Sequence, residues 1–440
     1  MPYTYTQTKI EENNSRVEKI KSVRGMNDLL PGRSDVWYRV ERAIREVVTS
    51  YGYREIRTPL LERTELFKRS IGEQTDIVEK EMYTFDDISG DSLTLRPEAT
   101  AACVRAGIEH GLLHNQQQRL WYLGPMFRRE RPQKGRYRQF QQFGIEALGW
   151  PGPDIDAEIM MVGTRLWRQL GLSQLTLEIN TLGDPESRGS YREALRAYLG
   201  RHREDLDPDS QRRLDRNPLR ILDSKIPQTQ QILEDAPDLP SFIDGKSKDD
   251  FSLLQMILSE NGIKFKVNSK LVRGLDYYTG PVFEWTTDLL GAQSAVCAGG
   301  RYDGLVLQLG GQPMPAAGFA CGVERLVEVY ETSADPVGNE QPDVWVCVIG
   351  DHSMSYALKN AEKLRDAGID TIINCGGGAV KRQLRRADQS GAQLVVVIGA
   401  DESMNGYATV KSLREDGGQT QVNESNLANY VCTRLREEQK

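Results

Sequence analysis

The chain has 440 residues, 39% of them hydrophobic, and a formal net charge of −7. This length allows more than one sizeable core, whereas the acidic balance excludes a protein that coats nucleic acid over its whole surface, because such binding needs a broad basic face. The six scattered cysteines form no CxxC pair, and no window of about 18 apolar residues occurs, so we expect reduced thiols in a cytoplasmic protein without a membrane span.

The first part of the chain alternates helical and strand-like patterns. Apolar residues at helical spacing from Trp37 to Tyr51 predict an amphipathic helix that Ser34 caps. A short strand is expected before Pro59, and strand-like runs follow at 92–98, 119–130 and 136–148, interrupted by a helix from about Thr100. Several antiparallel strands in succession predict an α+β domain built on an antiparallel sheet.

The rest of the chain divides into three stretches. Residues 183–268 are charged and helix-favouring, which predicts a helical insertion, and strands return at 271–286 and 316–322. Beyond a turn-rich stretch at 332–342, strand and helix alternate, which predicts a separate α/β domain. The expected domains are therefore 1–182 with 269–335, the insertion 183–268, and 342–440.

The stretch FRRERPQKGRYRQF, residues 127–140, carries six cationic side chains against one anionic one. If the strands on its two sides pair as a hairpin, one sheet face collects arginines, an aromatic ring, an amide and a carboxylate. That combination suits stacking of a base and a bidentate grip on phosphates, and Gly124 and Gly144 in the same row would let a ligand approach the backbone. A solvated sheet face with a basic loop is the alternative.

Several motifs together carry a family resemblance. FRRE (127–130), the basic loop and RYRQF (136–140) resemble motif 2 of the class II aminoacyl-tRNA synthetases, GFACGVERL (318–326) resembles motif 3, and residues 34–59 resemble motif 1. LVRGLDYYTGPVFEW (271–285) and TLRPEATAA (94–102) are similar to the histidine signature and the amino-acid-binding segment of histidyl-tRNA synthetases. The resemblance covers nearly the whole chain.

This resemblance implies a class II catalytic domain with a helical insertion, followed by an α/β anticodon-binding domain. It also implies a homodimer that joins L-histidine to ATP, with Mg²⁺, as histidyl-adenylate and then transfers the histidyl group to the terminal adenosine 3′-hydroxyl of tRNA-His. Adenylate formation needs no protein nucleophile, so positioning and stabilisation of negative charge dominate. A site rich in arginine and poor in histidine fits this chemistry.

The resemblance implies two catalytic arginines on either side of the α-phosphate. Arg128 would hold that phosphate, and Arg273 would also contact the substrate carboxylate and take over one metal role. The other ATP-binding residues implied are Glu130 for the adenine amino group, Arg136 for the γ-phosphate, and Phe140 and Arg325 for the two faces of adenine. A structural salt bridge is the plain alternative for each arginine.

The histidine pocket would read three parts of its ligand. The implied residues are Glu98, Thr100 and Gln142 for the α-ammonium group, Arg128 and Arg273 for the carboxylate, and Glu146, Tyr278 and its neighbour Tyr277 for the imidazole. A neutral imidazole offers one donor and one acceptor, which a carboxylate and a phenol hydroxyl can both satisfy. Because adjacent strand residues point to opposite faces, we expect one of the two tyrosines to touch substrate.

The basic loop and two other patterns concern tRNA and metals. Arg131, Gln133 and Lys134 in the loop would meet the acceptor end of tRNA. The stripe Lys381, Arg382, Arg385 and Arg386 predicts either a solvated helix face or a contact to tRNA phosphates. His110 and His114 have metal-like spacing but lack a glutamate base and a third ligand, so an ordinary helix end is expected and no protein-bound metal.

Two other readings stay open. One is the non-catalytic paralogue that serves as a regulatory subunit of the first enzyme of histidine biosynthesis. The arginines suited to binding phosphates and the domain after residue 341 argue against it. The other is a threonyl or prolyl enzyme of the same class, against which RGLDYYTG (273–280) and Glu146 weigh.

Overall fold

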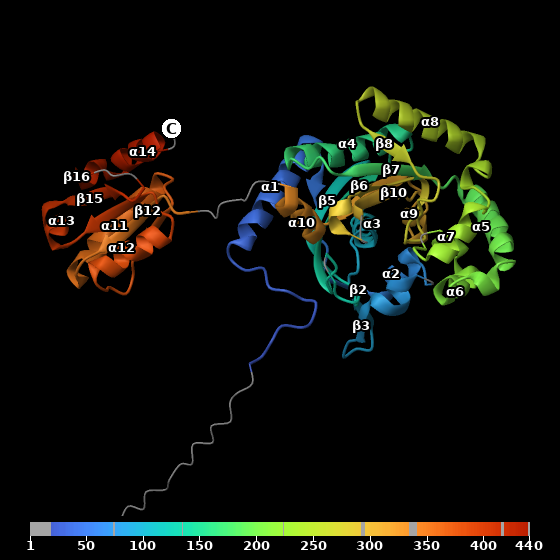
Figure 1. Cartoon of the computed structure of the whole chain (residues 1–440), viewed down its shortest axis with the longest axis horizontal. Helices are drawn as coiled ribbons and strands as arrows, with labels where there is room; N and C mark the ends of the chain where they lie inside the picture. The colour runs from blue at the N-terminus through green and yellow to red at the C-terminus, as the bar shows by residue number, and fades with distance from the viewer. Residues whose placement is uncertain are drawn as a thin grey trace, which may run out of the picture. The chain divides into compact units, whose positions relative to one another are not determined.

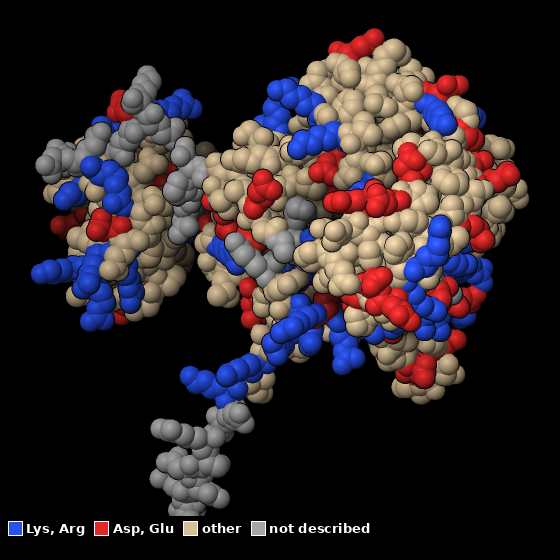
Figure 2. All heavy atoms as spheres, turned by 45° about the vertical axis from the view of Figure 1, so that its right-hand side comes forward, with Lys and Arg blue, Asp and Glu red and all other residues tan. Residues whose placement is uncertain are grey.

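The computed structural model describes residues 19–438 except 74, 134, 223, 292–294, 334–340 and 415–417. Two compact units divide the chain between Pro336 and Val337. Within the described ranges, no helix is both long and apolar enough to cross a bilayer. On the face drawn in Figure 2, Lys and Arg are interspersed with Asp and Glu over most of the first unit, in keeping with a local rather than a general affinity for polyanions.

An eight-stranded sheet forms the centre of the first unit. Its strands, in spatial order, are β1 (Arg54–Glu55), β5 (Gln118–Phe127), β6 (Gln139–Leu148), β11 (Ala316–Gly322), β10 (Ala295–Arg301), β9 (Thr279–Thr286), β7 (Thr176–Thr181) and β8 (Phe265–Val267). All neighbours run antiparallel except the outer pairs β1–β5 and β7–β8, so the predicted antiparallel sheet is confirmed. The strand that joins the two halves, β11, comes last in the chain.

Helices cover one face of this sheet. They are α1 (Arg33–Ser50), α4 (Pro153–Gln169) and α10 (Val323–Ser333). The apolar stripe of α1 is buried from Trp37 to Val48 and packs against Phe143 and Ile145, which point to this face of β6. The predicted cap was wrong by two residues: the cap position is Gly32, at φ 86°, and Ser34 lies inside the helix. Glycine fits there because it adopts a positive φ without strain.

A smaller sheet and four helical segments lie beside the main sheet. The sheet contains β2 (Leu61–Arg63), β4 (Ser92–Leu95) and β3 (Tyr83–Asp86), in that order. The helical segments are α2 (Thr64–Ile71), the π-helical turn η1 (Ile77–Glu81), α3 (Thr100–Glu109) and α9 (Leu305–Gln308). Phe67, Ile71 and Ile77 form a core of their own with Ala101 of α3, so α2 and η1 are anchored to the start of α3.

We call residues 182–264 the β7–β8 connection. Its helical segments are α5 (Pro185–Gly200), η2 (Arg203–Asp205), α6 (Pro208–Arg216), η3 (Pro218–Ile221), α7 (Pro227–Glu234), η4 (Leu239–Ser241) and α8 (Gly245–Glu260). Asp184, Asp207 and Asp244 cap α5, α6 and α8, because each carboxylate accepts backbone N–H groups of the first turn. α5, α6 and α7 lie together at one side of the unit (Figure 1), and α6 contacts the η1 region through ion pairs of Arg213 and Arg216. The domain limits 183–268 stay a prediction.

The second unit contains a five-stranded mixed sheet. Its strands, in spatial order, are β13 (Thr371–Ile373), β12 (Val344–Val348), β14 (Leu394–Ile398), β15 (Tyr407–Ser412) and β16 (Gln419–Asn423), and its main helices are α11 (Met354–Asp366), α12 (Val380–Gln389), α13 (Ala400–Asn405) and α14 (Leu427–Glu438). The alternation up to β14 gives parallel neighbours, as the pattern predicts. On α12, Gln383 and Ala387 are buried, whereas the predicted cationic stripe is exposed.

Candidate active site

A cavity of about 530 Å³ lies on the face of the main sheet opposite α1. All residues predicted from the sequence to bind ATP or histidine line it, except Glu146; these are Glu98, Thr100, Arg128, Glu130, Arg136, Phe140, Gln142, Arg273, Tyr277, Tyr278 and Arg325. They come from α3, the β5–β6 hairpin, the loop before β9 and the start of α10. The fold therefore brings together segments that lie up to about two hundred residues apart in the chain.

The β5–β6 hairpin forms as predicted and supplies the largest part of the lining. Gly124 pairs with Gln142 and Met126 with Phe140, so Phe140, Gln142 and Glu146 share the face that points to the cavity. Arg128 lies just beyond β5, where its Nε donates to the Pro97 carbonyl (2.9 Å) and its guanidinium lies 5.3 Å from the centre of the Phe140 ring. A cation and an aromatic ring thus stand together at one wall.

Two more arginines complete this wall. Arg136 forms an ion pair with Glu130 at 2.9 Å across the turn of the hairpin connection. Arg325 donates to the carbonyls of Gly135 (3.0 Å) and Ala295 (2.6 Å), and burial lowers its pKa, with the neighbouring Arg136 as the next cause. Partly buried cations this close together are stabilised when an anion enters.

Glu324 was missed in the sequence, although it ties Arg325 to the hairpin. Both of its carboxylate oxygens accept the backbone N–H of Gln141, at 2.8 and 3.0 Å. Burial raises the pKa of Glu324 to about 7. Its place directly before Arg325 in the motif 3 stretch could have indicated this contact. A buried carboxylate at the start of a helix needs backbone N–H donors.

The start of α3 contributes a buried carboxylate. Glu98 is 2% exposed and accepts the backbone N–H groups of Thr100 (2.7 Å) and Ala101 (3.1 Å). Burial raises the pKa of Glu98, and these two hydrogen bonds oppose the shift. Glu98 therefore both holds the first turn of α3 and presents a carboxylate to the cavity.

Glu146 lies below the cavity floor, 1% exposed, and is held by two hydroxyl groups. Thr100 Oγ1 donates to one carboxylate oxygen at 2.7 Å, and the hydroxyl of Tyr302 donates to the other. Burial raises the pKa of Glu146 to about 8, while both hydrogen bonds lower it. Tyr302 was not found from the sequence, because it lies in the turn after β10 and only the sheet order brings it to β6.

Both neighbouring tyrosines line the cavity, contrary to the expectation that one would face away. The expectation assumed a strand, but β9 begins at Thr279, so Tyr277 and Tyr278 lie in a turn and need not alternate. Their ring centres are 4.7 Å apart, and the ring of Tyr302 lies 5.6 Å from that of Tyr277. Three buried tyrosine rings therefore cluster at the side of the cavity where Glu146 lies.

The two glycines of the hairpin serve protein side chains rather than a ligand. A β-carbon at Gly124 would collide with the guanidinium of Arg96, and one at Gly144 would collide with the hydroxyl of Tyr122 and the Phe319 carbonyl. The expectation that they open the backbone to a ligand was wrong. Gly318 has the related function that the sequence analysis missed, because a β-carbon there would overlap the Glu146 carboxylate.

Arg273 lies in the loop before β9 and is 21% exposed. Its Nη1 pairs with Glu284 Oε2 at 2.9 Å, so its charge is compensated by a carboxylate of β9. Glu284 was not recognised in the sequence, although it belongs to the same signature. In the hairpin connection, Arg131 and Gln133 are exposed, and Lys134 lies outside the described residues.

Comparison with known proteins assigns the family. Residues 25–326 match the histidyl-tRNA synthetase family. The chain belongs to this family. Residues 343–434 match the anticodon binding domain, so the second unit is the anticodon-binding part of a synthetase. Together these matches confirm the α+β class II synthetase fold with a C-terminal anticodon-binding domain.

Solved structures agree with this membership. The structure of apo histidyl-tRNA synthetase from S. aureus is similar with a TM-score of 0.78 and 36% identity, covering 94% of this chain and 100% of that one. Histidyl-tRNA synthetase from a Nostoc species has a TM-score of 0.68 and 21% identity, covering 95% of this chain and 100% of that one. A Bacillus halodurans protein described as ATP phosphoribosyltransferase regulatory subunit/histidyl-tRNA synthetase has a TM-score of 0.65 and 22% identity, covering 88% and 100%. The last two show the fold alone.

The activity follows from the family. This histidyl-tRNA synthetase family member activates L-histidine with ATP to histidyl-adenylate and transfers the histidyl group to the terminal 3′-hydroxyl of tRNA-His. Both steps transfer a group between oxygen atoms, and neither needs a protein nucleophile. A cavity with six arginines and no histidine among its described lining residues has the charge that this reaction requires.

Proposed function

We propose that the 530 Å³ cavity is the adenylation site and that its residues have the roles that the sequence motifs imply. The observation that carries this proposal is the convergence of four separate segments on one cavity, which presents arginines at one end and tyrosines with a buried carboxylate at the other. Phosphates suit the first end and an imidazole the second. The two substrates would then meet between them.

At the arginine end, Arg128 and Arg273 would stabilise the α-phosphate during the reaction. A carboxylate oxygen of histidine attacks the α-phosphorus, the bond to pyrophosphate breaks, and negative charge grows on the oxygens between. Arg128 is held by the Pro97 carbonyl, so little reorganisation is needed when that charge appears. Arg273 would exchange its partner Glu284 for the substrate.

The adenine and the γ-phosphate would lie on the hairpin. Phe140 and Arg325 both line the cavity and would hold the two faces of the ring. Glu130 forms an ion pair with Arg136. We expect ATP to replace this ion pair, since the adenine amino group offers Glu130 a donor and the γ-phosphate offers Arg136 an anion.

At the tyrosine end, Glu146 and Tyr278 would read the two imidazole nitrogens. Glu98, Thr100 and Gln142 would accept from the α-ammonium group. Thr100 links the two subsites, because its hydroxyl already donates to Glu146 and its N–H to Glu98. A substrate without an imidazole would leave Glu146 buried without its third donor, which costs roughly 1–3 kcal/mol and excludes threonine or proline.

Mg²⁺ would enter with ATP. Among the described residues no group of three or more His, Cys, Asp and Glu could hold a metal ion, so the β- and γ-phosphates would supply most ligands. Glu81 fits this use: burial raises the pKa of Glu81, and the nearby charge of Glu130 raises it further, an arrangement that a cation relieves. The ion would neutralise charge on the leaving pyrophosphate.

The remaining proposals concern partners and location. Arg131 and Gln133, exposed beside the cavity wall, would contact the acceptor end of tRNA, together with Lys134. The exposed cationic face of α12 would contact tRNA phosphates in the anticodon-binding part. We also expect a homodimer in the cytoplasm, as the family resemblance implies.

ATP–pyrophosphate exchange with each amino acid in turn tests the proposed function. Exchange that depends on histidine and not on threonine or proline is expected. A protein that binds histidine but shows no exchange would fit the regulatory paralogue instead, and exchange with threonine or proline alone would overturn the histidine assignment.

A further inference from the structure

The loop at 273–278 carries Arg273, Tyr277 and Tyr278 but belongs to no strand. It therefore lacks the regular ladder of backbone hydrogen bonds that fixes the neighbouring strands. Three side chains of the β7–β8 connection form hydrogen bonds to this loop instead. Arg220 donates to the Gly274 carbonyl (3.2 Å), Asn217 donates to the Asp276 carboxylate (2.8 Å), and Arg188 donates to the carbonyls of Asp276 (3.2 Å) and Tyr278.

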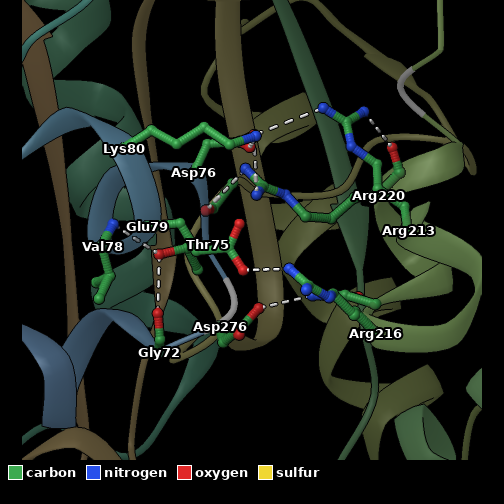
Figure 3. Close-up of polar contacts among 12 residues, drawn as sticks. Gly72, Thr75, Asp76, Val78, Glu79, Lys80, Arg213, Arg216, Arg220 and Asp276 are labelled. Atoms are coloured by element: carbon green, nitrogen blue, oxygen red, sulfur yellow. Dashed lines mark hydrogen bonds and ion pairs between the residues drawn. The ribbon is translucent and has the colours of Figure 1, made fainter. Parts of the chain in front are cut away.

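The same connection also forms ion pairs with the residues around η1, at another wall of the cavity. Arg220 pairs with Asp76 at 3.3 Å, Arg213 pairs with the same carboxylate at 3.5 Å, and Arg216 pairs with Glu79. Figure 3 shows these three arginines pointing from the α6–η3 region toward the residues around η1. Since Asp76 and the η1 residue Ile77 line the cavity, Arg220 joins two of its walls through one guanidinium.

Burial and packing keep the loop between these two supports. The Arg220 side chain is 17% exposed. On the other side, Leu275 packs against the core of α2 and η1, and the Asp276 N–H donates to the Ile71 carbonyl at 3.3 Å. Gly72, at φ 100°, has no space for a β-carbon, because the Asp276 carboxylate lies against it. The position of the loop thus depends on α2 and on the connection together.

We propose that Arg188, Asn217 and Arg220 are positioning residues for histidine activation, which act by holding the 273–278 loop in the geometry that substrate needs. The proposal rests on the proposed function, which places histidine and the α-phosphate against this loop. It assigns the β7–β8 connection a function in the first half of the reaction, before tRNA binds. Misplacing a bound group by about 1 Å can cost on the order of 100-fold in rate, so the effect should be measurable without tRNA.

Histidine-dependent ATP–pyrophosphate exchange by the full-length chain, without tRNA, tests this. The variants are Arg220→Ala, Arg220→Lys and Asn217→Ala. Arg212→Ala is the matched control, because Arg212 lies on α6, is 64% exposed and pairs with Asp209 of the same helix. Losing a charged hydrogen bond should raise the KM for histidine or lower kcat by about 10- to 100-fold in total, with the KM for ATP within about twofold.

Two further readouts separate positioning from a general structural function. Arg220→Lys should recover part of the activity, because a lysine keeps the charge but lacks the two separate nitrogens with which Arg220 contacts Asp76 and Gly274. In every variant, tRNA charging should fall no further than exchange does. Asn217→Ala removes one neutral side chain, so it tests the loop even where Arg220→Ala does not fold.

The outcomes distinguish this proposal from the proposed function. If Asn217→Ala and Arg220→Lys keep the exchange rate of the wild type and lose only tRNA charging, the positioning role is overturned. The connection would then act on tRNA. Equal weakening of ATP and histidine binding would also overturn it, as a sign of general distortion. If the wild type itself shows no histidine-dependent exchange, the proposed function fails and the positioning role fails with it.

Discussion

The hydroxyl of Tyr302 donates a hydrogen bond to the carboxylate of Glu146, although the two residues lie 156 positions apart in the chain. Thr100 donates to the other oxygen of the same carboxylate. Both contacts favour the ionised form of Glu146, whereas burial favours the protonated form and prevails. A ligand that donates a hydrogen bond to this carboxylate would therefore shift it toward the ionised form.

Tyr302→Phe should weaken histidine binding and leave ATP binding unchanged. The change removes a donor to Glu146, so the pKa of Glu146 rises further and less of the carboxylate is ionised at neutral pH. We expect the KM for histidine to rise by about 5- to 30-fold at pH 7, equivalent to about 1–2 kcal/mol, and to recover as the pH increases. The buried Tyr191 lies outside the cavity lining, so Tyr191→Phe is the control. Equal loss at pH 7 and pH 9 would contradict the explanation.

Histidine binding should release a proton from Glu146. Burial raises the pKa of Glu146 to about 8, so at pH 7.5 the group is largely protonated, whereas accepting an imidazole N–H favours the ionised form. Affinity for histidine should then rise with pH up to about 8. Calorimetry at pH 7.5 in two buffers of different ionisation enthalpy measures the release, and Glu146→Gln should abolish it. A wild type that exchanges no proton would show that Glu146 stays protonated and donates to the imidazole.

The same pKa shift predicts how the stability of the protein changes with pH. The folded-state pKa of about 8 lies above the ordinary value of 4.5 for a glutamate, so folding at a pH between these values takes up a proton. The wild type should therefore lose stability relative to Glu146→Gln as the pH rises through 8, with a slope of at most about 1.4 kcal/mol per pH unit. Thermal unfolding of both proteins from pH 6 to pH 9 measures the difference. An opposite slope would mean that Glu146 is ionised in the folded protein.

Arg273→Ala should abolish adenylate formation while the protein stays folded. Losing one preorganised donor costs about 3–4 kcal/mol in comparable sites, or about 100- to 1000-fold in rate. Single-turnover adenylation measures the rate, and Lys270→Ala, at an exposed position just before the loop, is the control. A rate within about threefold of wild type would leave Arg273 as the structural partner of Glu284.

Removing residues 338–440 should separate the two half-reactions. Every residue assigned to ATP or histidine lies at or before Arg325, so the fragment should keep histidine-dependent exchange. Charging should fall steeply, because linked contacts to one tRNA multiply their affinities. Light scattering must first show the fragment to be folded and in the same assembly state as the full chain. Charging at the full rate would refute an anticodon function for the second unit, and loss of exchange would mean that it supports the cavity.

The sequence predicted the hairpin pairing and the helix–strand alternation of the second unit, because both depend on local periodicity. It also predicted which side chains meet in the cavity, since the motifs carry that information. It failed where the cause is non-local. Tyr302 acquires its partner through sheet order, Tyr277 and Tyr278 leave the expected strand, and Gly144 accommodates Tyr122 from the neighbouring strand. No periodic pattern of residues in the sequence indicates these contacts.

The order of the main sheet has a consequence for synthesis on the ribosome. β11 lies between β6 and β10 but is translated last, so until about residue 322 has emerged the half-sheets β1–β5–β6 and β10–β9–β7–β8 remain unjoined. Each then presents an edge that can pair with another nascent chain, and closing it requires contacts over more than 160 residues, as between Gly318 and Glu146. The strand that closes the sheet is also the one whose glycine makes room for Glu146. Completion of the histidine pocket and protection from aggregation are therefore the same folding event.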